Sequence, residues 1–87
     1  MNNKQRKILA DIFELPTRSD VLWSDIEKLL RGLGAEITEG NGSRVRIALN
    51  DVKAVFHRPH PGRITDKGAL VSMRRFLIHT GVHYDEI

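Results

Sequence analysis

The chain contains two short segments, Arg44–Leu49 and Val52–His57, which are separated only by Asn50 and Asp51. In the first segment every second residue is apolar, a period of two that is typical of a β-strand with one buried face. Asn and Asp tolerate the left-handed backbone conformations that a two-residue hairpin turn requires. The sequence therefore predicts an antiparallel hairpin. The first strand is expected to bury Val45, Ile47 and Leu49 and to expose Arg44 and Arg46.

A third strand and a loop are predicted on either side of this hairpin. Ala35–Glu39 has the composition of a short strand, and Gly40-Asn41-Gly42 follows it as a turn. After the hairpin, Arg58–Arg63 contains two prolines and a glycine, which remove hydrogen-bond donors and break a strand ladder. We therefore expect an antiparallel meander of three strands, followed by a stiff, exposed and basic loop.

The first part of the chain is predicted to be helical. Asn3–Glu14 gathers its apolar residues on one helical face, and Pro16 ends this helix within the connector Leu15–Asp20. The apolar residues of that face are Ile8, Leu9, Ile12 and Phe13.

A second helix is predicted from the spacing of Ser24 and Glu27, which matches a capping box at a helix start. Trp23 precedes the box as a candidate hydrophobic staple, and we expect it in the core. Gly32 and Gly34 supply a left-handed stop. The apolar stripe between start and stop consists of Ile26, Leu29, Leu30 and Leu33.

A last helix is predicted after the basic loop. Thr65 or Asp66 provides its N-terminal cap, and Gly81 ends it. Its inward positions are Leu70, Met73, Phe76 and Leu77. The order helix, helix, strand, strand, strand, helix predicts an α+β fold, in which a three-stranded antiparallel sheet packs on helices.

The chain is short and lacks cysteine. Its 87 residues have room for one compact core, and without cysteine neither a disulfide nor a thiolate metal site can form. No apolar stretch is long enough for a membrane span or a signal peptide. We expect one domain over residues 1–87, with a helical extension at 1–20 and a core at 21–87, and a cytoplasmic location.

Positive charge is concentrated in the middle of the chain. Residues 42–75 contain eight Lys or Arg against two Asp, a net charge of +6, whereas the remainder contains six against nine, a net charge of −3. A segregated positive region suits a polyanion, because each Lys or Arg that neutralises a phosphate releases condensed counterions. Lys67 lies at a helix start, where its ammonium group and the free N–H groups both favour phosphate. Arg74 and Arg75 extend the same positive region.

Two histidines, His57 and His60, flank Arg58 and Pro59. Imidazole has an unperturbed pKa near 6.5, which suits proton transfer at neutral pH. To cut RNA, a base takes the 2′-hydroxyl proton, the oxygen attacks the adjacent phosphorus, and Arg or Lys stabilises the developing charge. This scheme needs no cofactor. The other histidines, His79 and His83, do not complete a convincing metal site, and we expect none.

These features together resemble the HicA toxin family. The resemblance rests on the order of elements, on the Gly-Ser pair in Gly40-Asn41-Gly42-Ser43, on the loop Arg58-Pro59-His60-Pro61-Gly62 and on the helix start Lys67-Gly68. It covers the chain from Val21 to the C-terminus. The resemblance implies a fold like that of duplex-RNA-binding domains, an endoribonuclease activity that blocks translation by cleaving mRNA, and neutralisation by a HicB-like antitoxin that covers the active surface.

One position departs from the family pattern. In HicA-like proteins the catalytic histidine directly follows the Gly-Ser pair, and this chain has Arg44 there. A guanidinium group is always charged and cannot accept a proton, but it can hold a phosphate. Either His57 or His60 then supplies the base, or the protein binds RNA and cleaves it poorly or not at all. His57 is preferred, because Arg44, Arg46 and His57 share one open face if the hairpin register allows.

The expected site combines catalytic and RNA-binding residues. The catalytic candidates are His57 and His60, and the residues expected to bind RNA are Ser43, Arg44, Arg46, Arg58, Arg63, Lys67 and Arg74. The expected partners are mRNA and a HicB-like antitoxin, in a homodimer or a hetero-oligomer with the antitoxin. A third hypothesis is a protein-interaction domain that assembles through its first helix and an exposed sheet edge.

Overall fold

The computed structural model describes residues 1–82, and the expectation for His83 lies outside this range. The elements are α1 (Asn3–Phe13), α2 (Trp23–Gly32), β1 (Glu36–Glu39), β2 (Arg44–Leu49), β3 (Val52–His57) and α3 (Lys67–His79). Their order confirms the predicted α+β fold. The bounds of β2 and β3 agree with the prediction, and β1 begins one residue later than expected.

The three strands form an antiparallel sheet in the order β1-β2-β3. Asn50 and Asp51 join β2 to β3 and have φ angles of 50° and 67°, the left-handed conformation expected of this turn. The pairing of Leu49 with Val52 sets the register of the whole hairpin. One consequence is that Arg44 lies directly opposite His57.

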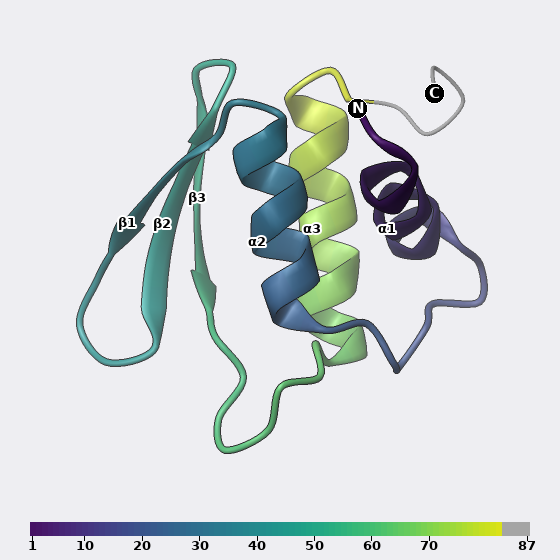
Figure 1. The fold of residues 1–87 in the computed structure, drawn as a ribbon. Coiled ribbons are helices and arrows are strands. Elements are labelled where there is room, and N and C mark those ends of the chain that lie inside the picture. The colour runs from purple at the N-terminus through teal and green to yellow at the C-terminus, as the bar shows by residue number, and fades with distance from the viewer. Residues whose placement is uncertain (83–87) are drawn as a thin grey trace.

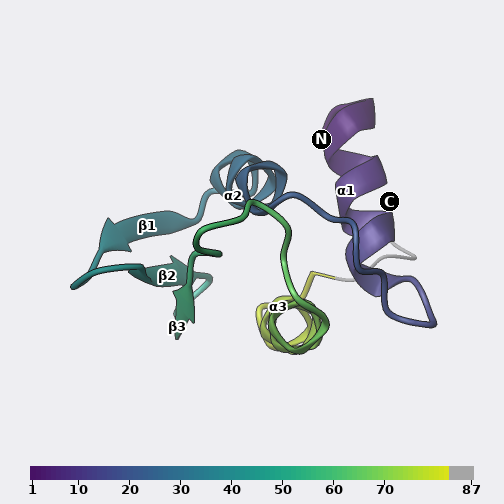
Figure 2. The ribbon, with the colours of Figure 1, turned by 90° about the horizontal axis from the view of Figure 1, so that it is seen from below.

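The elements form three layers. One face of the sheet packs on α2 and α3, and α1 covers the other side of these two helices (Figures 1 and 2). The second face of the sheet is not covered by any other element among residues 1–82 (Figure 2). This uncovered face, called the open face below, is the one to which Arg44 and Arg46 belong.

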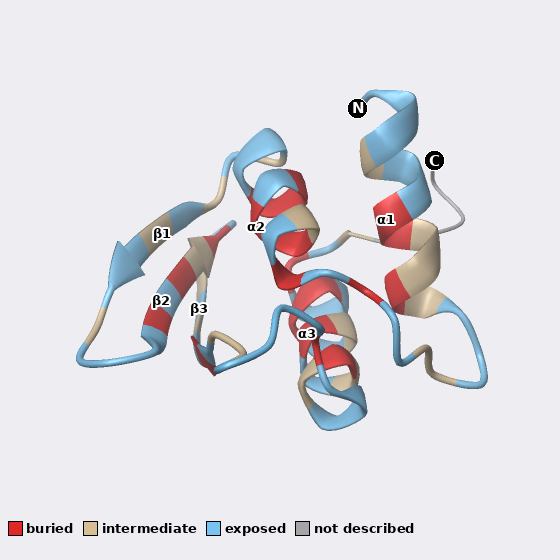
Figure 3. Cartoon of the chain, turned by 60° about the horizontal axis from the view of Figure 1, so that its bottom comes forward, coloured by how far each residue is buried: buried red, intermediate tan, exposed pale blue. Residues whose placement is uncertain are grey.

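The core lies between the sheet and the helices. Buried residues recur along β2 and on α2 and α3 (Figure 3). Val45, Ile47 and Leu49 are buried as the alternating pattern predicts. Trp23 is also buried and packs against Phe56, with ring centroids 5.9 Å apart. The expectation that this tryptophan is a core residue is confirmed.

The helix ends follow the predictions at α3 and at the C-terminal end of α2, but not at the start of α2. Asp66 caps α3 by accepting a hydrogen bond from the Ala69 N–H at 2.7 Å. At α2 the predicted capping box is wrong, because the helix starts at Trp23 and Leu22 occupies the capping position without a side-chain bond. The Glu27 carboxylate instead accepts hydrogen bonds from the side chains of Trp23 and Arg58. Gly34 has a φ of 94° just past the end of α2, as a left-handed stop requires.

The first helix has a capping box that was not predicted from the sequence. The Asn2 side chain accepts from the Gln5 N–H at 2.8 Å, and the Gln5 side chain accepts from the Asn2 N–H at 2.9 Å. Ile8, Leu9 and Ile12 on α1 are buried against α2 and α3. Within residues 1–82, no helix is both long and apolar enough to cross a membrane.

Candidate nucleic-acid interface

Four segments meet at one end of the molecule: the β1–β2 turn, the β3–α3 loop and the first turns of α2 and α3 (Figure 1). Backbone hydrogen bonds hold this loop end together. The Arg58 N–H donates to the Ser43 carbonyl at 2.8 Å, and the Trp23 N–H donates to the Arg63 carbonyl at 3.0 Å. The Thr65 N–H donates to the Val21 carbonyl at 2.8 Å. The proline-containing loop is therefore fixed against the β1–β2 turn and against the chain that enters α2.

Arg44 and His57 form a cross-strand pair where the open face reaches the loop end. The next pair along the ladder is Ser43 and Arg58, and the bond from the Arg58 N–H to the Ser43 carbonyl makes it a hydrogen-bonded pair. Since hydrogen-bonded and non-hydrogen-bonded pairs alternate, Arg44 and His57 form a non-hydrogen-bonded pair, in which side chains lie closest. Both side chains are exposed. The hairpin register thus places Arg44 and His57 side by side on the open face.

His60 lies in the β3–α3 loop, on the other side of the β1–β2 turn from the open face. With Gly42, Ser43, Arg58 and Pro59 it lines an open hollow of about 550 Å³. Gly42 has a φ of 60°, so the turn depends on a residue without a side chain at this point. The hollow brings the expected residues Ser43 and His60 to one place.

Arg58, one of the residues expected to bind RNA, binds two carboxylates of the protein itself. Its guanidinium group donates to Glu27 from Nε at 2.7 Å and from Nη2 at 3.1 Å, and to Glu39 from Nη1 at 2.6 Å. These carboxylates raise the pKa of Arg58 above its usual value. Because the donors already bind carboxylates, Arg58 ties α2, β1 and the β3–α3 loop together.

Glu27 is the buried member of this cluster, with 5% of its surface exposed. Burial by itself raises the pKa of Glu27, but hydrogen bonds from Arg58 and Trp23 and the charges of Arg58 and Arg31 outweigh it and hold the pKa below the ordinary value. The carboxylate therefore stays ionised under the loop. A carboxylate on an otherwise apolar helix face indicates that a cation lies nearby. The sequence does not identify that cation, because Arg58 is far from Glu27 along the chain.

The remaining expected cations are divided between two surfaces. Arg46 lies on the open face, two residues along β2 from Arg44. Arg63 lies in the loop, and Lys67 begins α3 at the same end. Arg63 shares a hollow of about 410 Å³ with Lys28 and Arg31 of α2. Lys28 and Arg31 were not among the expected residues, although their spacing of three places them on one polar helix face.

Arg74 lies away from both surfaces. It projects from α3 toward the end of α1 and donates to the Ile12 carbonyl at 2.9 Å, the Glu14 carbonyl at 3.2 Å and the Thr17 hydroxyl at 3.1 Å. The expectation that Arg74 extends the positive surface is therefore not supported by its contacts. Instead it binds the carbonyl groups that the end of α1 leaves free.

Replacing Arg74 by alanine is expected to lower the free energy of unfolding by about 1 to 3 kcal/mol, because three acceptors lose a charged donor. The neighbouring Arg75 is exposed, and Arg75→Ala should change it by less than about 0.5 kcal/mol. Urea unfolding of the two variants measures both values. Equal effects at the two positions would contradict the role of Arg74 as a clamp on α1.

The described residues 1–82 contain no group of three His, Cys, Asp or Glu side chains that could hold a metal ion. Comparison with protein families gives one match: residues 23–82 match the family described as the HicA toxin of bacterial toxin-antitoxin. The match begins at the first residue of α2 and includes the sheet, both histidine candidates and α3. Searches of curated proteins and of solved structures returned no match.

Proposed function

The chain belongs to the HicA family of toxins from bacterial toxin-antitoxin systems, and from this membership we propose that it is a toxin that binds and cleaves mRNA in the cytoplasm. A HicB-like antitoxin that covers the loop end neutralises it. The observation that carries the proposal is the pairing of Arg44 with His57 on an exposed surface. This pairing supplies a phosphate ligand and a proton acceptor side by side, although the histidine of the family pattern is absent.

In the proposed reaction His57 takes the proton of a ribose 2′-hydroxyl. The 2′-oxygen attacks the adjacent phosphorus while the bond from phosphorus to the 5′-oxygen breaks. We assign stabilisation of the charge on phosphorus to Arg44, and the leaving 5′-oxygen takes its proton from water, whose hydroxide then accepts the proton held by His57. The products are one RNA end with a 2′,3′-cyclic phosphate and another with a free 5′-hydroxyl.

The test is incubation of the purified protein with a structured mRNA across neutral pH. We expect fragments with cyclic phosphate and 5′-hydroxyl ends, which end-labelling and mass spectrometry identify. The control is the same RNA with 2′-O-methyl riboses, which has no proton to lose and should stay intact. If the folded protein leaves the unmodified mRNA intact, the ribonuclease proposal fails.

A second candidate function is RNA binding without cleavage, and Arg44 is the observation that favours it. A guanidinium group in place of the family histidine holds phosphate but does not transfer protons at neutral pH. In that case RNA binds, and binding weakens steeply with salt, but no fragments form. The antitoxin partner is tested separately, by co-purification with the product of the neighbouring gene.

A further inference from the structure

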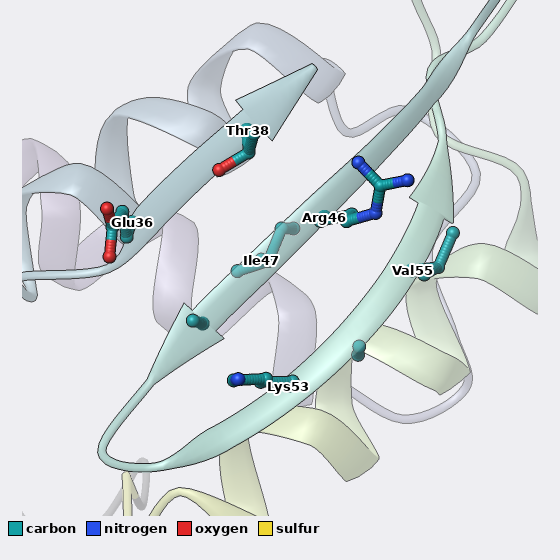
Figure 4. Close-up of a pocket in the computed structure, with 8 residues that line it drawn as sticks. Glu36, Thr38, Arg46, Ile47, Lys53 and Val55 are labelled. Carbon is teal, nitrogen blue, oxygen red and sulfur yellow. The ribbon is translucent and has the colours of Figure 1, made fainter. Parts of the chain in front are cut away.

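The open face of the sheet carries a row of cations that continues away from Arg44 and His57. Arg46 follows Arg44 on β2, and Lys53 lies on β3 opposite Ala48. Figure 4 shows Arg46 on the central strand between Thr38 and Val55, with Lys53 nearer the β2–β3 hairpin. No ion pair within residues 1–82 involves Arg44, Arg46 or Lys53. These three cations are therefore available to bind an external anion.

Between these cations the face is hollowed and has small or apolar residues. The hollow has a volume of about 370 Å³, and its floor includes Ala48 and Val55. Val55 is 46% exposed. One carboxylate, that of Glu36, lies at the edge on β1 (Figure 4). The face therefore offers apolar surface for bases beside cations for phosphates.

The dimensions of the face suit one strand of nucleic acid. Neighbouring β-strands lie about 4.8 Å apart, so three of them span only about 10 Å, whereas a duplex is held across its grooves over many base pairs. Along β2, the five residues from Arg44 to Ala48 are separated by four steps and cover about 13 Å, which a few nucleotides of an extended strand also cover. Cations along a groove that follows one backbone are typical of single-strand binding.

We propose that the open face binds single-stranded RNA, with Arg46 and Lys53 holding the phosphates next to the one cleaved at Arg44 and His57. This inference rests on the proposed function for the position of the cleaved phosphate, but it concerns binding and is testable without cleavage. It makes the substrate an unpaired strand rather than the duplex that the family fold suggests.

The experiment measures binding of a 2′-O-methyl oligonucleotide, which cannot be cleaved, as a single strand and as a duplex with its complement. We expect the single strand to bind more tightly. Arg46→Gln and Lys53→Gln should each weaken its binding several-fold and reduce the slope of log affinity against log salt by about 0.7. Glu36→Gln should strengthen binding, because it removes the carboxylate from the same face.

The matched controls are Arg6→Gln and Lys4→Gln on α1, which change the net charge equally but lie on the far side of the helical layer (Figure 2). They should leave affinity within two-fold of the parent, a margin of about 0.4 kcal/mol. If instead the duplex binds more tightly, and Lys28→Gln or Lys67→Gln weakens it while Arg46→Gln does not, the loop end binds a duplex and the proposal is wrong.

The outcome separates this inference from the proposed activity. Cleavage of mRNA at an unchanged KM in Arg46→Gln and Lys53→Gln overturns the single-strand surface and leaves the ribonuclease intact. Binding that depends on Arg46 and Lys53 in a protein that never cleaves supports the surface and overturns the ribonuclease. An effect of these variants on antitoxin binding alone, with no change in RNA affinity, assigns the face to a protein and also overturns the proposal.

Discussion

Replacement of His57 by alanine is expected to lower the rate of RNA cleavage by about 10² to 10⁴-fold, the usual contribution of a general base. The effect should fall on kcat more than on KM, since Arg44 still holds the phosphate. His57 is exposed at the end of β3, so the substitution removes no core contact. Single-turnover cleavage of a labelled RNA measures the rate, and growth arrest on induction in cells gives an independent readout.

Two further histidine variants make this result specific. His79 is exposed in the last turn of α3, at the opposite end from the loops, and His79→Ala should cleave at the parent rate. His60→Ala should slow cleavage less than His57→Ala does, because His60 lies in the loop hollow and not beside Arg44. Full toxicity in both His57→Ala and His60→Ala would remove histidine catalysis from consideration.

Replacement of Arg58 by alanine is expected to lower the free energy of unfolding by about 2 to 3 kcal/mol, because Glu27 is left as a buried carboxylate without its main partner. The loop that carries His60 also loses its link to α2 and β1. Glu39→Gln is the matched control. It removes the exposed partner of Arg58 and should cost less than about 1 kcal/mol. Urea unfolding at neutral pH measures both.

The effect of Arg58→Ala depends on pH with a definite sign. In the parent the pKa of Glu27 lies below its ordinary value of 4.5, so the stability that the pair contributes is fully present above pH 4.5 and is lost as the pH falls through the lowered pKa. In the variant, burial is less strongly opposed and the pKa of Glu27 rises. The gap in stability between the two proteins should therefore be full at neutral pH and narrow in acid. A gap that is independent of pH would show that Glu27 is not the group responsible.

Arg44 and Glu27 differ in how much of their environment local sequence predicts. The sequence located the turn at Asn50-Asp51 but left the strand register open; in the structure the two-residue hairpin pairs Arg44 with His57. Glu27 was interpreted as part of a capping box, since spacing alone cannot tell a carboxylate that bonds its own helix from one that bonds a distant arginine. Its partner is 31 residues away.

Three arginines also differ in their surroundings, although they share one positive region of the sequence. Arg46, Arg58 and Arg74 all belong to the positive region of the sequence, but only Arg46 lies on an uncovered face without an ion-pair partner among residues 1–82. Net charge was a property of the segment, whereas access to a ligand depends on which carboxylates and carbonyls the packing brings within reach.

What the sequence determined by itself was local: the alternation that divides β2 into two faces, the turn that fixes the hairpin, and the order of elements shared with the HicA family. Each depends on residues close together along the chain. What only the tertiary structure decided was which cations are free. Packing of α2, α3 and the β3–α3 loop commits Arg58 to Glu27 and Arg74 to α1, because a buried carboxylate or a helix end without a donor is costly.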